Sequence, residues 1–196
     1  MILVNNFLKF ILDYFLAIFF LVIFLIPFLL VSIMILVFDG KPIFFIQERA
    51  GIKGKIINVI KFKTIINVKN KKIVSKLGKF LRITRIDEIP QIINVLKGEL
   101  SFVGPRPLYV KYIKLYSAKQ KRRLEMKPGI TGWAQINGDN NISWKKKFDL
   151  DIWYINNFNI LIDIKIILLT IIFFMNRILF YNKIKNLKKI IDKEFD

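Results

Sequence analysis

The chain has 196 residues, 54% of them hydrophobic, and its 33 Lys and Arg against 14 Asp and Glu give a formal net charge of +19. The length suits one compact domain plus a membrane segment, and the charge suits an anionic membrane surface, a polyanion or a phosphorylated substrate. Because Cys and His are absent, disulfides, Cys-based zinc sites and Ser-His-Asp triads are excluded, and acid–base or nucleophilic chemistry falls to carboxylates, Lys, Tyr, Ser or Thr.

An apolar run without a charged side chain extends from Tyr14 to Phe38. At about 1.5 Å per residue it is long enough to cross a hydrocarbon core of about 30 Å. Pro27 predicts a kink, because it removes a backbone N–H and collides with the preceding turn. A kinked helix could span the bilayer or return to its own side as a re-entrant hairpin, and both topologies remain open. The cations that follow, from Lys41 to Lys63, place the rest of the chain in the cytoplasm by the positive-inside rule.

The remainder predicts an α/β fold that is mostly α with a few short strands. Strands are expected at residues 42–47 and 56–64, and helices at 77–83, 90–96, 110–126 and 144–156. Loops are expected at residues 67–75, 101–107 and 127–141, where Lys and Asn or Gly and Pro gather. The charge-interrupted apolar stretch 160–180 predicts an amphipathic helix in the membrane interface, with a core helix as the alternative.

Two adjacent carboxylates, Asp87 and Glu88, are the candidate centre of the chemistry. Thr84 is expected to cap a helix start, with Asp87 at the third position of a capping box and Pro90 near the first turn. Acidic residues at a helix start usually serve only as caps. The pair by itself is therefore a weak indication of catalysis.

Cations surround this pair in the sequence: Arg82, Arg85, Lys61, Lys63, and Arg106 between two prolines. Cations lower the pKa of a carboxylate, which then stays ionised and can bind a metal or attack phosphorus. They can also hold phosphate oxygens during phosphoryl transfer. The cluster therefore predicts a phosphate-transfer site that works without His, although a surface salt bridge is an equal alternative for Arg106.

Three tryptophans offer large aromatic faces. Trp133, Trp144 and Trp153 could stack on a base or a sugar, or fill core and membrane-interface positions. The packing interpretation is favoured for Trp144 and Trp153, and less so for Trp133, which lies in a Gly-rich loop.

A series of motifs in fixed order resembles the bacterial sugar transferase family, specifically its small monotopic phosphoglycosyl transferases. The likeness runs from the N-terminal helix to about residue 175. The motifs are the apolar helix broken at Pro27, QERAG (47–51), KFKT (61–64), RIDEIPQ (85–91), NVLKGELSFVGPRP (94–107), KPGITGWAQING (127–138) and FDLDIWYI (148–155). Each motif is weak alone, but the complete ordered set is highly specific.

The resemblance implies a ping-pong reaction. A UDP-sugar would give its phosphosugar to undecaprenyl phosphate and release UMP, which starts lipid-linked glycan assembly. Asp87 would be the nucleophile that forms an aspartyl-phosphosugar and would also bind Mg²⁺, and Glu88 would assist by positioning and proton handling. Lys61 would pair with one carboxylate of the dyad, while Arg82 and Arg106 would hold phosphate.

The resemblance also implies a location and a domain plan. Residues 1–39 would form a re-entrant membrane anchor, residues 40–182 the catalytic domain, and residues 183–196 a charged tail. The catalytic domain would face the cytoplasm at the bacterial inner membrane. The implied partners are the UDP-sugar, undecaprenyl phosphate and membrane lipid, and not nucleic acid.

Two positions depart from the family pattern. The family breaks its helix at a Ser-Pro step, whereas this chain has Ile26 before Pro27. Relatives place a basic residue where this chain has Asp139, so either Lys145 or Lys146 substitutes, the donor sits differently, or activity is reduced. A catalytically impaired homologue that acts as a membrane scaffold is therefore the alternative function. A membrane-tethered nucleic-acid binder, motivated only by charge, is the third.

Overall fold

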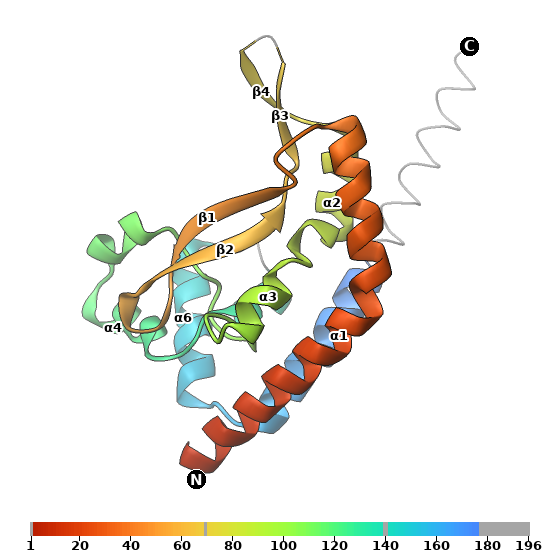
Figure 1. The fold of residues 1–196 in the computed structure, drawn as a ribbon. Coiled ribbons are helices and arrows are strands. Elements are labelled where there is room, and N and C mark those ends of the chain that lie inside the picture. Colours follow the sequence, from red (N-terminus) through yellow and green to blue (C-terminus); the bar gives the residue numbers. More distant parts are fainter. Residues whose placement is uncertain (1, 69, 139–140, 177–196) are drawn as a thin grey trace, which may run out of the picture.

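Helices make up most of the computed structural model, which describes residues 2–68, 70–138 and 141–176 (Figure 1). The α-helices are α1 (Ile2–Phe38), α2 (Lys76–Thr84), α3 (Gln91–Leu96), α4 (Ala118–Lys121), α5 (Trp133–Ile136), α6 (Trp144–Asn156) and a further helix over residues 160–176. The 3-10 helices are η1 (Ile52–Gly54), η2 (Ile86–Glu88), η3 (Val110–Leu115) and η4 (Arg122–Glu125). The strands are β1 (Phe44–Ala50), β2 (Ile56–Phe62), β3 (Ile65–Val68), β4 (Lys71–Val74), β5 (Ser101–Val103) and β6 (Gly129–Thr131). The expectation of a mostly helical fold with short strands is confirmed for these residues.

The strands pair two by two. β1 and β2 are antiparallel, with Phe44 opposite Phe62, and β3 and β4 form a second antiparallel hairpin. That hairpin corrects the loop expected at residues 67–75. The Lys and Asn content suggested a loop, but β-branched residues of β3 and β4 favour strands, and Asn70 takes the left-handed conformation (φ 61°) that a tight turn needs.

Residues 110–126 do not form the single helix that was expected. The segment is divided into η3, α4 and η4, because Tyr116 is extended and Ser117 starts a new helix through a capping box with Gln120. The expected loops at 101–107 and 127–141 contain the parallel pair β5–β6 and α5. Glycine makes this pairing possible, because a Cβ on Gly104 would lie 2.4 Å from the Lys127 carbonyl oxygen.

The long helix α1 packs on the rest of the chain through one stripe. Lys9, Asp13, Ala17, Val31 and Ile35 are buried at helical spacing, while most other large side chains of α1 are exposed. The segment Val4–Phe38 is long and apolar enough to cross a membrane by length and composition. Figure 1 shows that α1 is one continuous helix whose axis bends in its C-terminal half, the half that contains Pro27.

Polar contacts hold the N-terminal end of α1 to the domain. The Lys9 Nζ lies 2.6 Å from the Asp163 Oδ2 and donates to the Val103 carbonyl oxygen at 2.8 Å. One turn further on, the Asp13 Oδ1 accepts from the Ser101 hydroxyl at 3.0 Å. These groups are buried, so they fix the position of the helix.

The C-terminal end of α1 is held to the same domain. The Ser75 hydroxyl donates to the Asp39 Oδ2 at 2.6 Å, and the Lys63 Nζ donates to the backbone carbonyl oxygen of Asp39 at 2.7 Å. A cation at the C-terminus of a helix also interacts favourably with the helix dipole. Both ends of α1 therefore touch one globular domain.

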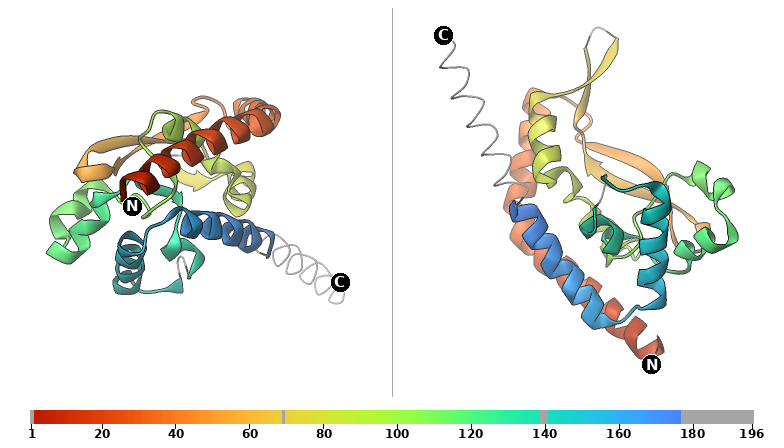
Figure 2. Two further views of the ribbon diagram at one scale, coloured as in Figure 1. Left: turned by 90° about the horizontal axis from the view of Figure 1, so that it is seen from below. Right: turned by 180° about the vertical axis from the view of Figure 1, so that it is seen from behind.

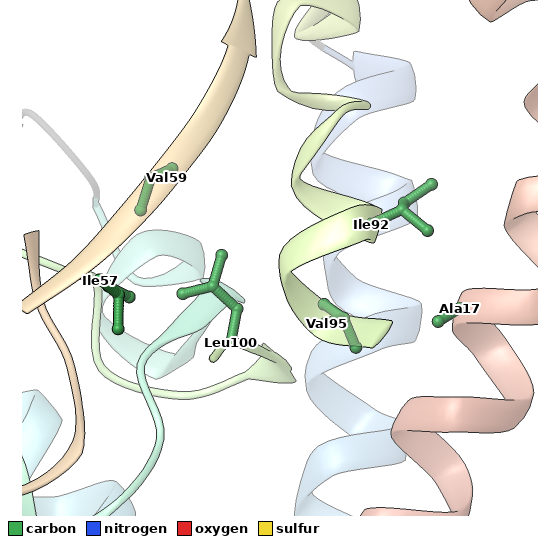
Figure 3. Close-up of a cluster of buried hydrophobic side chains, with 6 residues drawn as sticks. All are labelled: Ala17, Ile57, Val59, Ile92, Val95 and Leu100. Carbon is green, nitrogen blue, oxygen red and sulfur yellow. The ribbon is translucent and has the colours of Figure 1, made fainter. Parts of the chain in front are cut away.

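A hydrophobic core joins β2, α3 and α1 (Figure 3). In this close-up, α3 lies between β2 and α1, and Ile92 and Val95 extend from it near Ala17 of α1. Figure 2 shows that the helix over residues 160–176 lies on the same side of the domain as α1. This helix buries Ile166 but exposes Leu161, Leu168 and Met175.

Candidate active site

The two carboxylates lie on a tight turn between α2 and α3. α2 ends at Thr84, Arg85 takes the left-handed conformation (φ 58°), and η2 then carries Asp87 and Glu88, each only 8% exposed. The expected capping role of Thr84 is wrong. Thr84 is the last residue of α2, and its hydroxyl donates to the Phe80 carbonyl oxygen at 2.9 Å. The helix expected at 77–83 continues to Thr84 and ends there, because the left-handed Arg85 reverses the chain direction.

Three cations converge on one oxygen of Glu88. The Glu88 Oε1 lies 2.6 Å from the Lys61 Nζ, 3.4 Å from an Arg85 guanidinium nitrogen and 3.5 Å from an Arg106 guanidinium nitrogen. Lys61 comes from β2, Arg85 from the end of α2, and Arg106 from the loop after β5. The expected pairing of Lys61 with a dyad carboxylate is observed, and Arg106 belongs to the same cluster.

Two other predicted cations have different contacts. The exposed Arg82 donates from Nε to the Thr64 hydroxyl at 2.9 Å, which turns it toward the end of β2. Lys63 donates to the backbone carbonyl oxygens of Asp39 and Lys41, in the turn that follows α1. Alternate residues of a strand share a face, so a strand that continued through both residues would place Lys61 and Lys63 on one face. Lys63 lies just beyond the end of β2 and is not governed by this alternation.

The two carboxylates differ in acidity. Burial alone would raise the pKa of Glu88, but the charges of Lys61, Arg106 and Arg85 outweigh it and lower that pKa to about 2. Burial and the neighbouring Glu88 raise the pKa of Asp87, against the opposing charges of Lys61, Arg85 and Arg82. The expected lowering of a carboxylate pKa by the surrounding cations is therefore found for Glu88 and not for Asp87. A group with a pKa near 2 stays ionised at neutral pH, which favours a positioning role for Glu88, and its proton-handling role stays a prediction.

One oxygen of Asp87 is left without a hydrogen bond by the part of the chain that the structure describes. Its Oδ1 is buried and has no hydrogen-bond partner among the described residues. No group of three or more acidic side chains gathers within that part of the chain. Mg²⁺ commonly takes one or two carboxylates and completes its shell with substrate phosphates and water. The free oxygen of Asp87 fits such an ion, provided that the substrate supplies most of the ligands.

A largely apolar cavity of about 330 Å³ lies beside the dyad, and we call it the dyad cavity. Phe20 and Phe24 of α1 line one side, and Ile167 and Ile171 of the helix over residues 160–176 line another. Charged groups occupy one part of its wall, namely Arg85, Glu88 and Arg106. Sequence reasoning missed this cavity, since its walls come from segments far apart in the chain.

A second cavity of about 210 Å³, the aromatic cavity, lies on the other side of Arg106 and Gln135, which line both cavities. Trp144 and Lys147 also line it, whereas Lys145 and Lys146, the cations proposed to replace a basic residue at 139, are exposed and lie outside its lining. Asp139 itself lies outside the described residues.

The other tryptophans pack on each other. The rings of Trp133 and Trp153 stack with their centroids 4.7 Å apart. The packing interpretation is thus confirmed for Trp153 and extends to Trp133. Trp144 is 56% exposed and remains open to a ligand.

The site suits a group-transfer enzyme that handles phosphate at a membrane, because cations and a buried carboxylate meet beside an apolar cavity. Comparison with known proteins gives the family. The model of the bacterial sugar transferase family matches residues 4–177. The chain therefore belongs to this family, whose similar members here include undecaprenyl-phosphate sugar-1-phosphate transferases. The resemblance inferred from the motifs is confirmed.

Three relatives illustrate the similarity. The chain is 51% identical over 140 residues to the uncharacterized sugar transferase EpsL of Bacillus subtilis (strain 168), covering 67% of this chain and 69% of EpsL. It is 42% identical over 155 residues to the galactosyl transferase CpsE of Streptococcus agalactiae serotype III, covering 68% of this chain and 34% of CpsE. It is 37% identical over 186 residues to the UDP-glucose:undecaprenyl-phosphate glucose-1-phosphate transferase of Escherichia coli (strain K12), covering 86% of this chain and 40% of that enzyme. The chain thus spans about a third to two fifths of the last two relatives.

Proposed function

We propose that the chain transfers a phosphosugar from a UDP-sugar to undecaprenyl phosphate and releases UMP. The observation that carries this proposal is that the two carboxylates of the dyad have different contacts. Glu88 gathers three cations around one ionised oxygen, while Asp87 beside it keeps a buried oxygen without a partner among the described residues. Cations of this kind suit a diphosphate, and the free carboxylate oxygen suits attack on phosphorus.

The reaction proceeds in two displacements at the sugar-bearing phosphorus. An Asp87 oxygen forms a bond to this phosphorus, the bond to the bridging oxygen breaks, and UMP leaves with the electron pair. An oxygen of the lipid phosphate then attacks the same phosphorus and frees the Asp87 carboxylate. With the Asp87 carboxylate and the lipid phosphate in their ionised forms, neither step would need a general base, and the chain has no His to serve as one.

The charged residues around Asp87 would bind and position the diphosphate of the donor. Glu88 keeps Lys61, Arg85 and Arg106 together, and these cations bind the diphosphate oxygens next to Asp87. Asp87 directly precedes Glu88 in η2, so a diphosphate bound to these cations would lie close to the Asp87 carboxylate. Mg²⁺, held by Asp87 and the donor phosphates, would neutralise the charge that develops on the leaving group.

The dyad cavity suits the lipid acceptor. Its walls are mostly apolar, and it lies between α1 and the helix over residues 160–176. The charged part of the wall, with Arg85 and Arg106, would receive the phosphate head while the isoprenoid tail extends along the two helices. The exposed apolar side chains of both helices would then face the membrane.

The contacts of α1 support a re-entrant anchor. Lys9 at one end and Asp39 at the other both bind the same domain, and a helix that crossed the bilayer would place its ends on opposite sides. We therefore place the anchor in one leaflet and the catalytic domain at the cytoplasmic face of the inner membrane, following the cations after α1.

The experiment is a donor screen with purified full-length protein in nanodiscs. A panel of UDP-sugars is tested for UMP release with undecaprenyl phosphate and Mg²⁺, and intact-protein mass spectrometry detects phosphosugar on the protein. Asp87→Asn should abolish release and trapping, whereas Asp149→Asn, which changes an exposed carboxylate on α6, should leave both intact. An active Asp87→Asn variant would exclude Asp87 as the nucleophile. A wild-type protein inactive with every donor would favour the scaffold alternative.

A further inference from the structure

The aromatic cavity has no role in the mechanism above, yet it adjoins the dyad. Arg106 lines both cavities, and its guanidinium is 3.5 Å from the Glu88 Oε1. Any ligand in the aromatic cavity therefore lies within reach of a cation that already belongs to the phosphate site. At about 210 Å³ the cavity is smaller than the 300–1,000 Å³ of sites that hold a whole drug-sized ligand, so it suits one part of a larger molecule.

Aromatic rings form much of its wall. Tyr109 and Tyr112 meet edge to face with centroids 5.8 Å apart, and Trp144 lies 6.1 Å from the ring of Phe148. Trp144 is 56% exposed although it is the largest of these side chains. An open indole at the mouth of a cavity offers a face on which a planar heterocycle can stack.

Cations complete this wall. The Arg49 guanidinium lies 3.8 Å from the centre of the Tyr109 ring, and the Lys147 Nζ lies 4.7 Å from that of Trp144. Arg123 also lines the cavity, but it is paired with Asp151 at 2.8 Å in a buried salt bridge. The positive charge available to a ligand therefore comes from Arg49, Lys147 and Arg106. Planar aromatic surface together with several cations matches a nucleoside phosphate.

Gln135, in the wall between the two cavities, is an independent indication of a ligand site, because its side-chain amide lacks hydrogen-bond partners among the described residues. Both polar atoms of its side-chain amide are buried and have no hydrogen-bond partner among the described residues. Buried amides are nearly always hydrogen-bonded, because an unsatisfied one is costly. Gln135 lines both cavities, so a ligand that passes from one to the other would contact this amide.

We propose that the aromatic cavity binds the UMP half of the donor, with the base stacked on Trp144 and the phosphate between Arg49, Arg106 and Lys147. This inference rests on the proposed function for the identity of the ligand. The diphosphate would cross the wall at Arg106 and Gln135 and so bring its sugar-bearing phosphorus to Asp87. The two substrates then occupy different cavities, with the nucleotide in one and the lipid in the other.

The test uses UMP itself as the probe. Calorimetric titration of UMP into full-length protein in nanodiscs with Mg²⁺ should show binding, and Trp144→Ala should weaken it about tenfold, which is typical for loss of base stacking. Trp144→Phe keeps an aromatic face and should retain most of the affinity. Lys147→Ala should weaken binding, while the matched change Lys121→Ala, on an exposed lysine of α4 outside the cavity, should not.

Steady-state kinetics separates this inference from the proposed function. If the wild type turns over, Trp144→Ala should raise the KM for the UDP-sugar about tenfold and leave the KM for undecaprenyl phosphate unchanged. An unchanged donor KM and unchanged UMP binding in Trp144→Ala and Lys147→Ala would refute the nucleotide site while the transferase assignment stands. If no donor is turned over, UMP binding that depends on Trp144 still supports the site, and absence of UMP binding overturns it.

Discussion

Replacing Glu88 by Gln should lower the free energy of unfolding at neutral pH by up to about 3 kcal/mol. The pKa of Glu88 falls from 4.5 to about 2 in the folded protein, and each pH unit corresponds to about 1.4 kcal/mol. This value is an upper limit, because the variant also removes the carboxylate charge that raises the pKa of Asp87. The neutral amide interacts only weakly with Lys61 and the two arginines.

The sign of the pH dependence follows from the lowered pKa. A carboxylate whose folded pKa lies below its unfolded value stabilises the protein above the unfolded value, here 4.5, and loses this effect as the pH falls toward 2. The difference in unfolding free energy between wild type and Glu88→Gln should therefore be constant from pH 8 to about 5.5 and shrink below that.

Denaturant unfolding followed by tryptophan fluorescence, at pH 7 and pH 3, measures this difference. Glu125→Gln is the matched control, because Glu125 forms an exposed ion pair with Arg122 and should change stability by less than about 0.5 kcal/mol. Equal stability of wild type and Glu88→Gln at pH 7, or a difference that is the same at both pH values, would refute the electrostatic account of the site.

Three further predictions concern other parts of the site and its anchor. Lys61→Met should move the acid limb of the pH–rate profile to higher pH, because Lys61 lowers the pKa of Asp87; an unmoved limb would contradict that coupling. Lys9→Met should cost about 3–5 kcal/mol by leaving Asp163 buried without its cation, and Lys9→Met with Asp163→Leu should recover much of the loss in thermal unfolding. EDTA should stop UMP release and Mg²⁺ should restore it, with no change in the Tm measured without donor, since the donor brings most of the metal ligands.

Composition, charge and motif order predicted part of the fold and part of the site. The apolar run and Pro27 predicted a long bent helix. The charge pattern and the ordered motifs predicted that Lys61 and Arg106 join the dyad, although Lys61 lies 27 residues from Glu88. The motif order predicted the family, which the family comparison confirms. These features depend on composition, residue spacing and motif order, all of which can be read directly from the sequence.

Features that depend on the direction of a side chain or on packing between distant segments could not be predicted. Lys61 and Lys63 are two residues apart, yet one binds Glu88 and the other binds the end of α1, because the strand ends between them. The pKa of Glu88 is lowered and that of Asp87 is raised, because burial raises both pKa values and the cations outweigh it only at Glu88. This balance depends on the tertiary structure and cannot be read from the sequence. The two cavities depend on how α1, α6 and the loop carrying Arg106 meet.

The salt bridge between Lys9 and Asp163 also constrains how the chain folds during synthesis. Its two residues are 154 positions apart, so the buried charge on α1 meets its partner only when almost all of the described chain has been made. At about 5–20 residues per second, this leaves an interval of about 8–30 s. Val31 and Ile35 can pack on Phe62 and Leu81 earlier, but until residue 163 is made Lys9 lacks its partner and the outer apolar face of α1 is uncovered. We therefore expect early contact of this helix with the membrane to limit aggregation.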